Sequence, residues 1–252
     1  MQLSADLFIP FGYLLAVCLT ALLAGLIQGL SGFGSVLVAL PLLVFFLDLR
    51  TAVPLVSIWG MCINLLLLVG LWRQMQLARI LPLTVAALPG IPVGVYLLKH
   101  IPVRILELWL GLILVGFAAY FIGSKGKTRV LGQGWGYLAG FVSGCLGGSL
   151  AASGPPVIMY TAVQPWSKDA IKATLTGYFA LSGVIIIAAQ AVEQLYTREV
   201  LLYGFFSAPF ILGGVVMGLW FYRRLNTTHY RQVIVGLITL LGFLTTARAL
   251  GR

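Results

Sequence analysis

Charged residues are scarce in this chain of 252 amino acids. Lysine, arginine, aspartate and glutamate together make up 9% of the sequence, whereas ordinary soluble domains contain roughly a quarter. Hydrophobic residues make up 60%, and the mean hydropathy is +1.04. These values exclude an ordinary soluble domain. Because apolar stretches recur along the whole chain, we predict an all-α polytopic membrane protein.

Cysteine and histidine are also rare, with three and two residues. Cys18, Cys62 and Cys145 lie far apart inside apolar runs, which indicates packing roles and no disulfide framework. The sequence has no paired histidines or cysteines at metal-ligand spacing, and the segment 151–154 lacks the leading glycine of an intramembrane serine protease motif. We therefore expect no enzyme, no metal and no cofactor.

Acidic residues are outnumbered by basic ones, 6 against 16, and the net charge is +10. Because the basic residues stand singly in short loops, they favour cytoplasmic loops and argue against nucleic-acid binding. Ten fall on one side of the predicted membrane and six on the other, so we expect the first side to be cytoplasmic and both termini to lie outside. The ten are Arg73, Arg79, Lys125, Lys127, Arg129, Lys168, Lys172, Arg223, Arg224 and Arg231.

Two glycine-rich stretches of the chain resemble one another. A shift of 115 positions superposes three glycines and a proline of the first on those of the second. Glycine frees the backbone and proline removes a hydrogen-bond donor, so both stretches are predicted to interrupt regular helix at matching places. The matched residues are Gly25 with Gly140, Gly29 with Gly144, Gly32 with Gly147, and Pro41 with Pro156.

The apolar runs next to these stretches are too short to cross a bilayer. Runs 33–47 and 154–166 reach only about 22 Å and about 20 Å as helices, against about 30 Å of hydrocarbon. We interpret 8–47 and 135–166 as helical hairpins that bend inside the membrane. The alternative is two pairs of short, fully crossing helices. Six further runs are predicted to be ordinary spans.

The two halves match beyond these hairpins, at Gly111-Leu112-Ile113 and Gly236-Leu237-Ile238 among other places. An odd number of crossings per half inverts the second copy. The predicted fold is therefore two inverted repeats, each a broken or re-entrant hairpin plus three transmembrane helices. Residues 1–123 form the first repeat, 124–134 a basic cytoplasmic linker, and 135–252 the second repeat.

Polar residues gather around the breaks, where non-helical backbone is tolerated only beside a cavity. Glycine turns leave N–H groups free for an oxyanion, and a following helix start adds positive potential. No charged residue lies at the predicted midplane, which favours weak or no proton coupling. The candidate binding residues are Gln28, Ser31, Gly32, Gly34, Ser35, Asn64, Gly147, Gly148, Ser149, Ser153 and Thr176, with Pro41, Pro155 and Pro156 fixing the breaks.

The doubled motif, Gly25-x-x-x-Gly29-x-x-Gly32-x-Gly34 with Pro41 and its echo from Gly140 to Pro156, resembles the TauE/SafE sulfite exporter family, also called the toluene sulfonate uptake permeases. The resemblance covers essentially the whole chain. It implies a bacterial inner-membrane transporter for sulfite, organosulfonates or related sulfur-containing anions, with a site where the two hairpins meet. Phe33 stands where the second half has Gly148, so we expect the halves of the site to differ.

The expected partners are a small anion and the lipid bilayer, and a homo-oligomer is left open. Two other interpretations stay open as well. One is a ten-helix metabolite exporter of another family, which predicts full crossings at 33–47 and 154–166. The other is a membrane scaffold that transports nothing.

Overall fold

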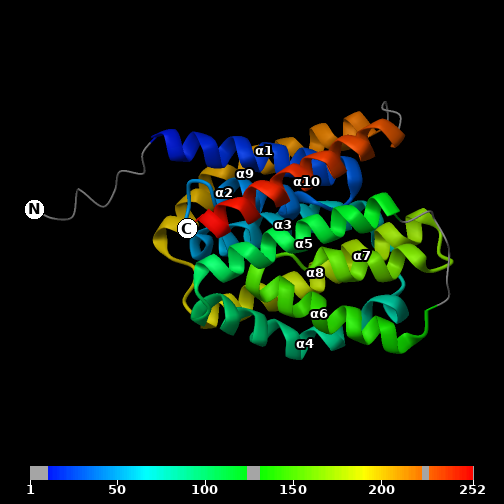
Figure 1. Cartoon of the computed structure of the whole chain (residues 1–252). Helices are drawn as coiled ribbons and strands as arrows, with labels where there is room; N and C mark the ends of the chain where they lie inside the picture. The colour runs from blue at the N-terminus through cyan, green and yellow to red at the C-terminus, as the bar shows by residue number, and fades with distance from the viewer. Residues whose placement is uncertain (1–10, 124–130, 223–226, 252) are drawn as a thin grey trace, which may run out of the picture.

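The structure, a computed structural model, describes residues 11–123, 131–222 and 227–251, and this part of the chain is helical without strands. Figure 1 shows the helices as one elongated bundle, with most axes running along its length. The elements are α1 (Phe11–Ser31), α2 (Ser35–Leu43), α3 (Leu49–Leu71), a 3-10 turn η1 (Trp72–Gln74), α4 (Leu77–His100), α5 (Val103–Gly123), α6 (Gln133–Leu150), α7 (Gly154–Val163), α8 (Lys168–Val192), α9 (Arg198–Tyr222) and α10 (Thr227–Gly251).

Six helical segments are long and apolar enough to cross a membrane: those that begin at Phe11, Leu49, Leu77, Val103, Asp169 and Arg198. The multi-pass prediction is therefore confirmed. In α10, the apolar stretch Ile238–Gly251 is shorter than a full span among the described residues. The helices α2 and α7, with 9 and 10 residues, are too short to cross.

The first hairpin enters and leaves by the same end of the bundle. The rings of Tyr13, at the start of α1, and Phe46, just beyond α2, lie with centroids 6.3 Å apart. Between the two helices the chain reverses at Gly32 and Gly34, whose φ angles of 79° and 96° lie in the left-handed region that favours glycine. The first hairpin therefore turns back at these glycines, and its re-entrance into the membrane stays a prediction.

The second hairpin does the same at the opposite end. The side chain of Gln164, just after α7, donates to the carbonyl of Leu131, just before α6, at 3.1 Å. Its reversal carries one left-handed residue, Ala151, with φ 51°. Both hairpins close on themselves, and the helices within 33–47 and 154–166 are only 9 and 10 residues long, which favours the re-entrant interpretation over full crossings.

Contacts between helix termini define the two ends of the bundle. End A gathers residues 43–50, 98–104, 192–198 and 248–251, and end B gathers 72–79, 131–133 and 163–168. At end A, Arg104 at the start of α5 donates to the carbonyl of Ala249 in α10 at 2.8 Å. At end B, the guanidinium of Arg79 lies 4.5 Å from the ring centroid of Trp166. The first hairpin opens at end A and the second at end B.

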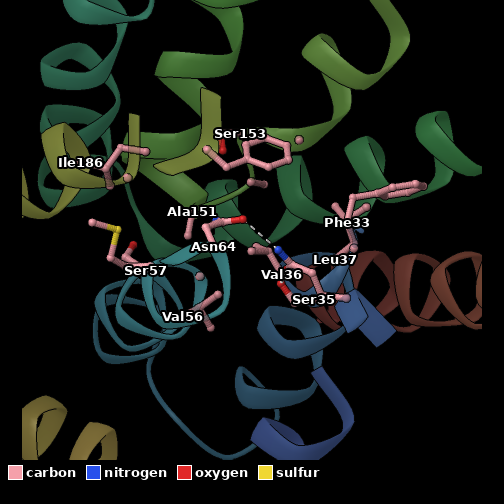
Figure 2. A pocket seen from close by; sticks show the side chains of 18 of the residues that line it. Phe33, Ser35, Val36, Leu37, Val56, Ser57, Asn64, Ala151, Ser153 and Ile186 are labelled. Carbon is pink, nitrogen blue, oxygen red and sulfur yellow. Dashed lines mark hydrogen bonds between the residues drawn. The ribbon is translucent and has the colours of Figure 1, made fainter. Parts of the chain in front are cut away.

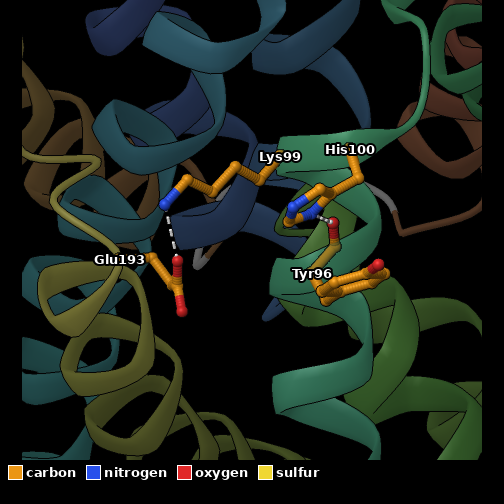
Figure 3. A network of polar contacts seen from close by, with 4 residues as sticks. All are labelled: Tyr96, Lys99, His100 and Glu193. Atoms are coloured by element: carbon orange, nitrogen blue, oxygen red, sulfur yellow. Dashed lines mark hydrogen bonds and ion pairs between the residues drawn. The ribbon is translucent and has the colours of Figure 1, made fainter.

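An ion pair joins two neighbouring helices at end A (Figure 3). Lys99 Nζ in the last turn of α4 lies 2.7 Å from Glu193 Oε2, which follows α8. The hydrogen bond from Lys99 lowers the pKa of Glu193 below its usual range. Beside it, the ring of His100 stacks on that of Tyr96 with centroids 4.0 Å apart. These contacts place the ends of α4 and α8 together.

The contacts pair each long helix with a long helix of the other half. The helix α1 packs on α9 and α4 on α6, while α3 packs on α8 and α5 on α10. Glycines allow the first two pairs to approach closely. A side chain added at Gly94 would meet the carbonyl oxygen of Cys145 at 2.1 Å, and one at Gly218 would meet that of Leu26 at 2.3 Å. If α1 to α5 are exchanged with α6 to α10 in order, the same pairs result and every helix runs in the opposite direction. This arrangement is compatible with inverted repeats.

Polar caps start the third helix of each half. The side chain of Asp48 accepts from the N–H of Arg50 at 2.8 Å and begins α3. Ser167 accepts from the N–H of Ala170 at 3.2 Å and begins α8. The predicted linker lies largely outside the described residues, so the domain boundaries stay a prediction.

Candidate functional site

A cavity of about 70 Å³ lies where the two reversals meet between α3 and α8 (Figure 2). A single water needs roughly 10 to 15 Å³ of such space, so the cavity has room for a few waters or one small polyatomic anion. Every side chain that lines it is uncharged. The lining comes from Gln28, from the start of α2 (33–37), from α3 (Val56, Ser57, Gly60, Met61, Asn64), from the second reversal (151–154), from Ile158, and from α8 (Phe179, Gly183, Ile186).

Three polar side chains of the first half form a network at the cavity wall. Gln28 Nε2 donates to Asn64 Oδ1 at 3.2 Å, and the hydroxyl of Ser35 donates to Gln28 Oε1. All three residues are buried. Because buried polar groups are costly unless they are paired, this network holds α1, α2 and α3 together at the cavity. Figure 2 draws the hydrogen bond to Asn64 as a dashed line.

The positive end of α2 faces the cavity. Gly34 is the N-cap residue of α2, and no side chain caps the helix. Gly34, Ser35, Val36 and Leu37 all line the cavity. The first N–H groups of a helix have no acceptor inside it and carry part of the positive end of its dipole. The first turn of α2 thus presents amide donors to whatever occupies the cavity.

The start of α7 faces the cavity from the other half, with fewer donors. Ser153 is its N-cap residue and makes no capping bond, and two prolines follow Gly154. Proline has no N–H, so Pro155 and Pro156 remove two of the amides that α2 has at this place. The Ser153 hydroxyl has no hydrogen-bond partner among the described residues and is the polar side chain that this hairpin offers.

The polar network of the second half lies behind the cavity wall. The hydroxyl of Tyr178 donates to Ser143 Oγ at 2.7 Å, and the Ser143 hydroxyl donates to the carbonyl of Ser153. Ser143 occupies the place of Gln28 under the shift that matches the glycine motifs. The second network therefore joins its hairpin to α8 as the first joins its hairpin to α3, but it does not face the cavity.

The structure brings five of the eleven predicted binding residues to the cavity wall: Gln28, Gly34, Ser35, Asn64 and Ser153. Ser31 and Gly32 lie in the reversal but off the cavity. The Gly32 N–H donates to the carbonyl of Gln28 at 2.7 Å, and the Ser31 hydroxyl donates to that of Ile27 at 2.7 Å. Thr176 is fully buried in α8, one turn from Phe179, and its Oγ1 has no partner among the described residues.

The second amide nest, predicted at Gly147–Ser149, is wrong in its position. These residues belong to the last turn of α6, which ends at Leu150, so the reversal comes later in the chain. Gly148 packs against α4, where an added side chain would meet the carbonyl oxygen of Ile91 at 2.4 Å. Phe33 is therefore not opposite Gly148 in the site; its ring meets the edge of Phe117 on α5 at 6.4 Å.

The prolines also differ in role. Pro155 and Pro156 open α7. Pro41 lies inside α2, six residues after its start, and so does not form the first break. Sequence reasoning missed the residues that line the second reversal, Ala151 and Ala152, because alanine carries no signal of a break. It also missed Tyr178 as the partner of Ser143.

Two charged residues of the long helices, Lys172 and Glu107, do not line the cavity. The stem of Lys172 in α8 lies across Gly32, with its Cε 3.3 Å from the position of an added side chain. Glu107 in α5 is buried. Neither changes the uncharged character of the cavity itself.

Two broken hairpins that enter from opposite ends and meet at a small uncharged cavity define a class, the multi-pass membrane transporters. The model of the family described as sulfite exporter TauE/SafE matches residues 17–245. The chain belongs to this family, and the resemblance noted from the glycine motifs is confirmed. The comparisons with curated proteins and with solved structures give no match.

Proposed function

We propose that the chain moves sulfite or a related small sulfur-containing anion, organosulfonates among them, across the bacterial inner membrane by alternating access. The observation that carries the proposal is the uncapped start of α2 at a partly open, uncharged cavity. Amide donors and the positive end of a helix dipole favour an anion, and they act more strongly where water is excluded.

The size and polarity of the cavity favour a compact oxyanion. At about 70 Å³, the cavity accepts a sulfite-sized ion, whereas an organosulfonate requires extra room beside Ile158, Phe179 or Ile186. In this arrangement, the oxyanion accepts from the α2 amides, and the hydroxyl of Ser153 lies on the opposite wall. Gln28 and Asn64 hold the wall and add amide donors within reach.

The orientation of the two hairpins suggests how the cavity becomes accessible from each side of the membrane in turn. Each opens toward a different end of the bundle, so a rocking of one half against the other exposes the cavity alternately. An anion that leaves a negative cell interior gains about 2.3 kcal/mol per charge per 100 mV, so export needs no coupled ion. We keep the prediction that end B is cytoplasmic.

The test is ligand-induced stabilisation of purified protein, followed by counterflow in proteoliposomes. Sulfite, sulfate, thiosulfate, taurine and sulfoacetate are screened by thermal shift. A ligand at a hundred times its Kd stabilises the folded state by about 2.7 kcal/mol. We expect sulfite or a close relative to raise Tm and to show counterflow without a pH gradient.

Failure of all five anions in both assays would overturn the transport proposal and favour the scaffold interpretation. A Gly148→Leu variant would not distinguish a transporter from a scaffold, because Gly148 packs directly on α4 and a larger side chain would disturb that packing. Counterflow that appears only with a pH gradient would leave transport standing and contradict the absence of proton coupling.

A further inference from the structure

A second hollow, separate from the central cavity, opens on the membrane-facing side of the second hairpin. It is a groove of about 640 Å³ between α5, α6 and α7. Apolar and aromatic side chains line it, including Trp135, Leu138 and Met159. Trp135 and Leu138 are more than half exposed, which places the groove at the outer surface of the bundle.

The groove exists because the two halves differ at this place. In the first half, α10 packs on α2, and Arg248 donates to the carbonyl of Val44. In the second half, α5 stands away from α7, and the Tyr120 hydroxyl reaches the carbonyl of Met159 only at 3.5 Å. The helix α10 fills the space beside the first hairpin, whereas α5 leaves the equivalent space beside the second hairpin open.

One pair of matched residues contributes to the difference. The register that matches Gly111 to Gly236 also matches Gly116 of α5 to Leu241 of α10. Leu241 is buried in the core, whereas Gly116 lines the groove. No atom lies within 4 Å of a side chain added at Gly116. The absence of a side chain at Gly116 therefore contributes open space to the groove.

The setting of the groove indicates what fills it. One of its helices, α5, is long and apolar enough to cross the hydrocarbon, where the available material is lipid acyl chain. Toward end B, the groove carries Tyr120, Trp135 and Tyr160, residue types that favour the membrane interface. The ring of Tyr160 meets Trp166 at 6.4 Å, and Arg79 lies over Trp166.

Arg79 supplies a positive charge at end B, where it lies over Trp166 outside the lining of the groove. Its guanidinium makes no ion pair within the described part of the chain. We infer that the groove binds one anionic phospholipid of the end-B leaflet, with an acyl chain against Gly116 and Met159 and the phosphate near Arg79. The positively charged guanidinium favours a phosphate, and anionic lipids are attracted to basic residues at the cytoplasmic surface.

The bound lipid supports the second hairpin from behind. Pro155 and Pro156 line the groove, while Gly154 and Ile158 of the same helix line the central cavity. The lipid and the transported anion therefore lie on opposite faces of α7.

The experiment measures retained lipid by native mass spectrometry after extraction in detergent, so it does not depend on transport. Gly116→Leu plugs the groove with the side chain that α10 has. Gly213→Leu is the matched control, because Gly213 in α9 also has no atom within 4 Å and lies outside the groove. We expect wild type and Gly213→Leu to retain one phosphatidylglycerol and Gly116→Leu to retain at least tenfold less.

A headgroup arm tests Arg79. In nanodiscs with equal phosphatidylglycerol and phosphatidylcholine, we expect wild type to prefer phosphatidylglycerol and Arg79→Gln to retain both equally. If Gly116→Leu retained as much phospholipid as wild type, the groove would not be the binding site. The same conclusion would follow if Gly213→Leu lost as much phospholipid as Gly116→Leu. Should Gly116→Leu fail to fold, Ala139→Phe, which also plugs the groove, decides between the same outcomes.

Discussion

The two hairpins share a shape and differ in chemistry. Hairpin one turns at Gly32 and Gly34 and presents an uncapped helix start with a full set of amides. Hairpin two turns at Ala151 and begins its helix with two prolines. Because the two hairpins have similar backbone shapes, each can carry different side chains and serve a different function. In the proposed function, the first binds the charged group of the ligand, and the second lines the cavity with small and apolar side chains.

The polar networks show the same division of roles. Gln28, Asn64 and Ser35 stand at the cavity wall, whereas Ser143 and Tyr178 are buried behind it. Both networks join a hairpin to the following long helix. In the proposed function, we expect the first to respond to a ligand and the second to contribute to stability.

Disrupting the close helix packing that both halves share has the largest expected effect on stability. Gly94→Leu and Gly218→Leu each push a side chain into backbone of the neighbouring helix, at α4–α6 and α1–α9. We expect each to destabilise the fold by about 3 kcal/mol or more and to remove the monodisperse peak in size-exclusion chromatography. Gly213→Leu, on α9 with open space, is the control and should elute as wild type. A normal peak for either packing variant would contradict the close helix approach.

Separating the two networks is the next test. Ser35→Ala removes a donor to Gln28 at the cavity, and we expect roughly fivefold weaker sulfite binding, equivalent to about 1 kcal/mol, in titration calorimetry. Tyr178→Phe removes the donor to Ser143, and we expect about 1 kcal/mol of lost stability with unchanged sulfite affinity. If Tyr178→Phe weakened binding as much as Ser35→Ala, the division of roles would fail.

Making the second hairpin resemble the first should strengthen binding. The double variant Pro155→Ala, Pro156→Ala returns two N–H groups to the start of α7. We expect a several-fold gain in sulfite affinity by the same titration. Ala152→Gly, which adds no donor, is the control. Weaker or unchanged binding by the double variant would show that α7 amides do not reach the ligand.

The smallest effect concerns the reversal itself. Ala151 has φ 51°, a conformation that costs a non-glycine residue roughly 1 kcal/mol, and hairpin one uses glycine at both of its left-handed positions. We expect Ala151→Gly to raise stability by about 0.5 kcal/mol in chemical denaturation, because relief of strain exceeds the added entropy of the unfolded chain. A loss of stability would indicate that Ala151 is not strained.

Much of this fold was predictable, and much of the site was not. Hydropathy and run length gave the spans and the two short helices, since these follow directly from bilayer thickness. The exact reversal was harder to predict, because glycine serves both helix breaks and helix contacts. Gly34 serves the first purpose and Gly148 the second, and only their neighbours in space distinguish them. Tyr178 was unpredictable because its partner Ser143 is distant in sequence.

The central claim is that backbone amides at the start of α2 bind the anion, and Val36→Pro tests it most directly. Proline at this first-turn position removes one N–H while the helix start can persist, as Pro155 shows in α7. Val36→Ala controls for the lost side chain. We predict at least tenfold weaker sulfite binding for Val36→Pro, by titration calorimetry, with Val36→Ala close to wild type. Wild-type affinity in Val36→Pro would contradict the account.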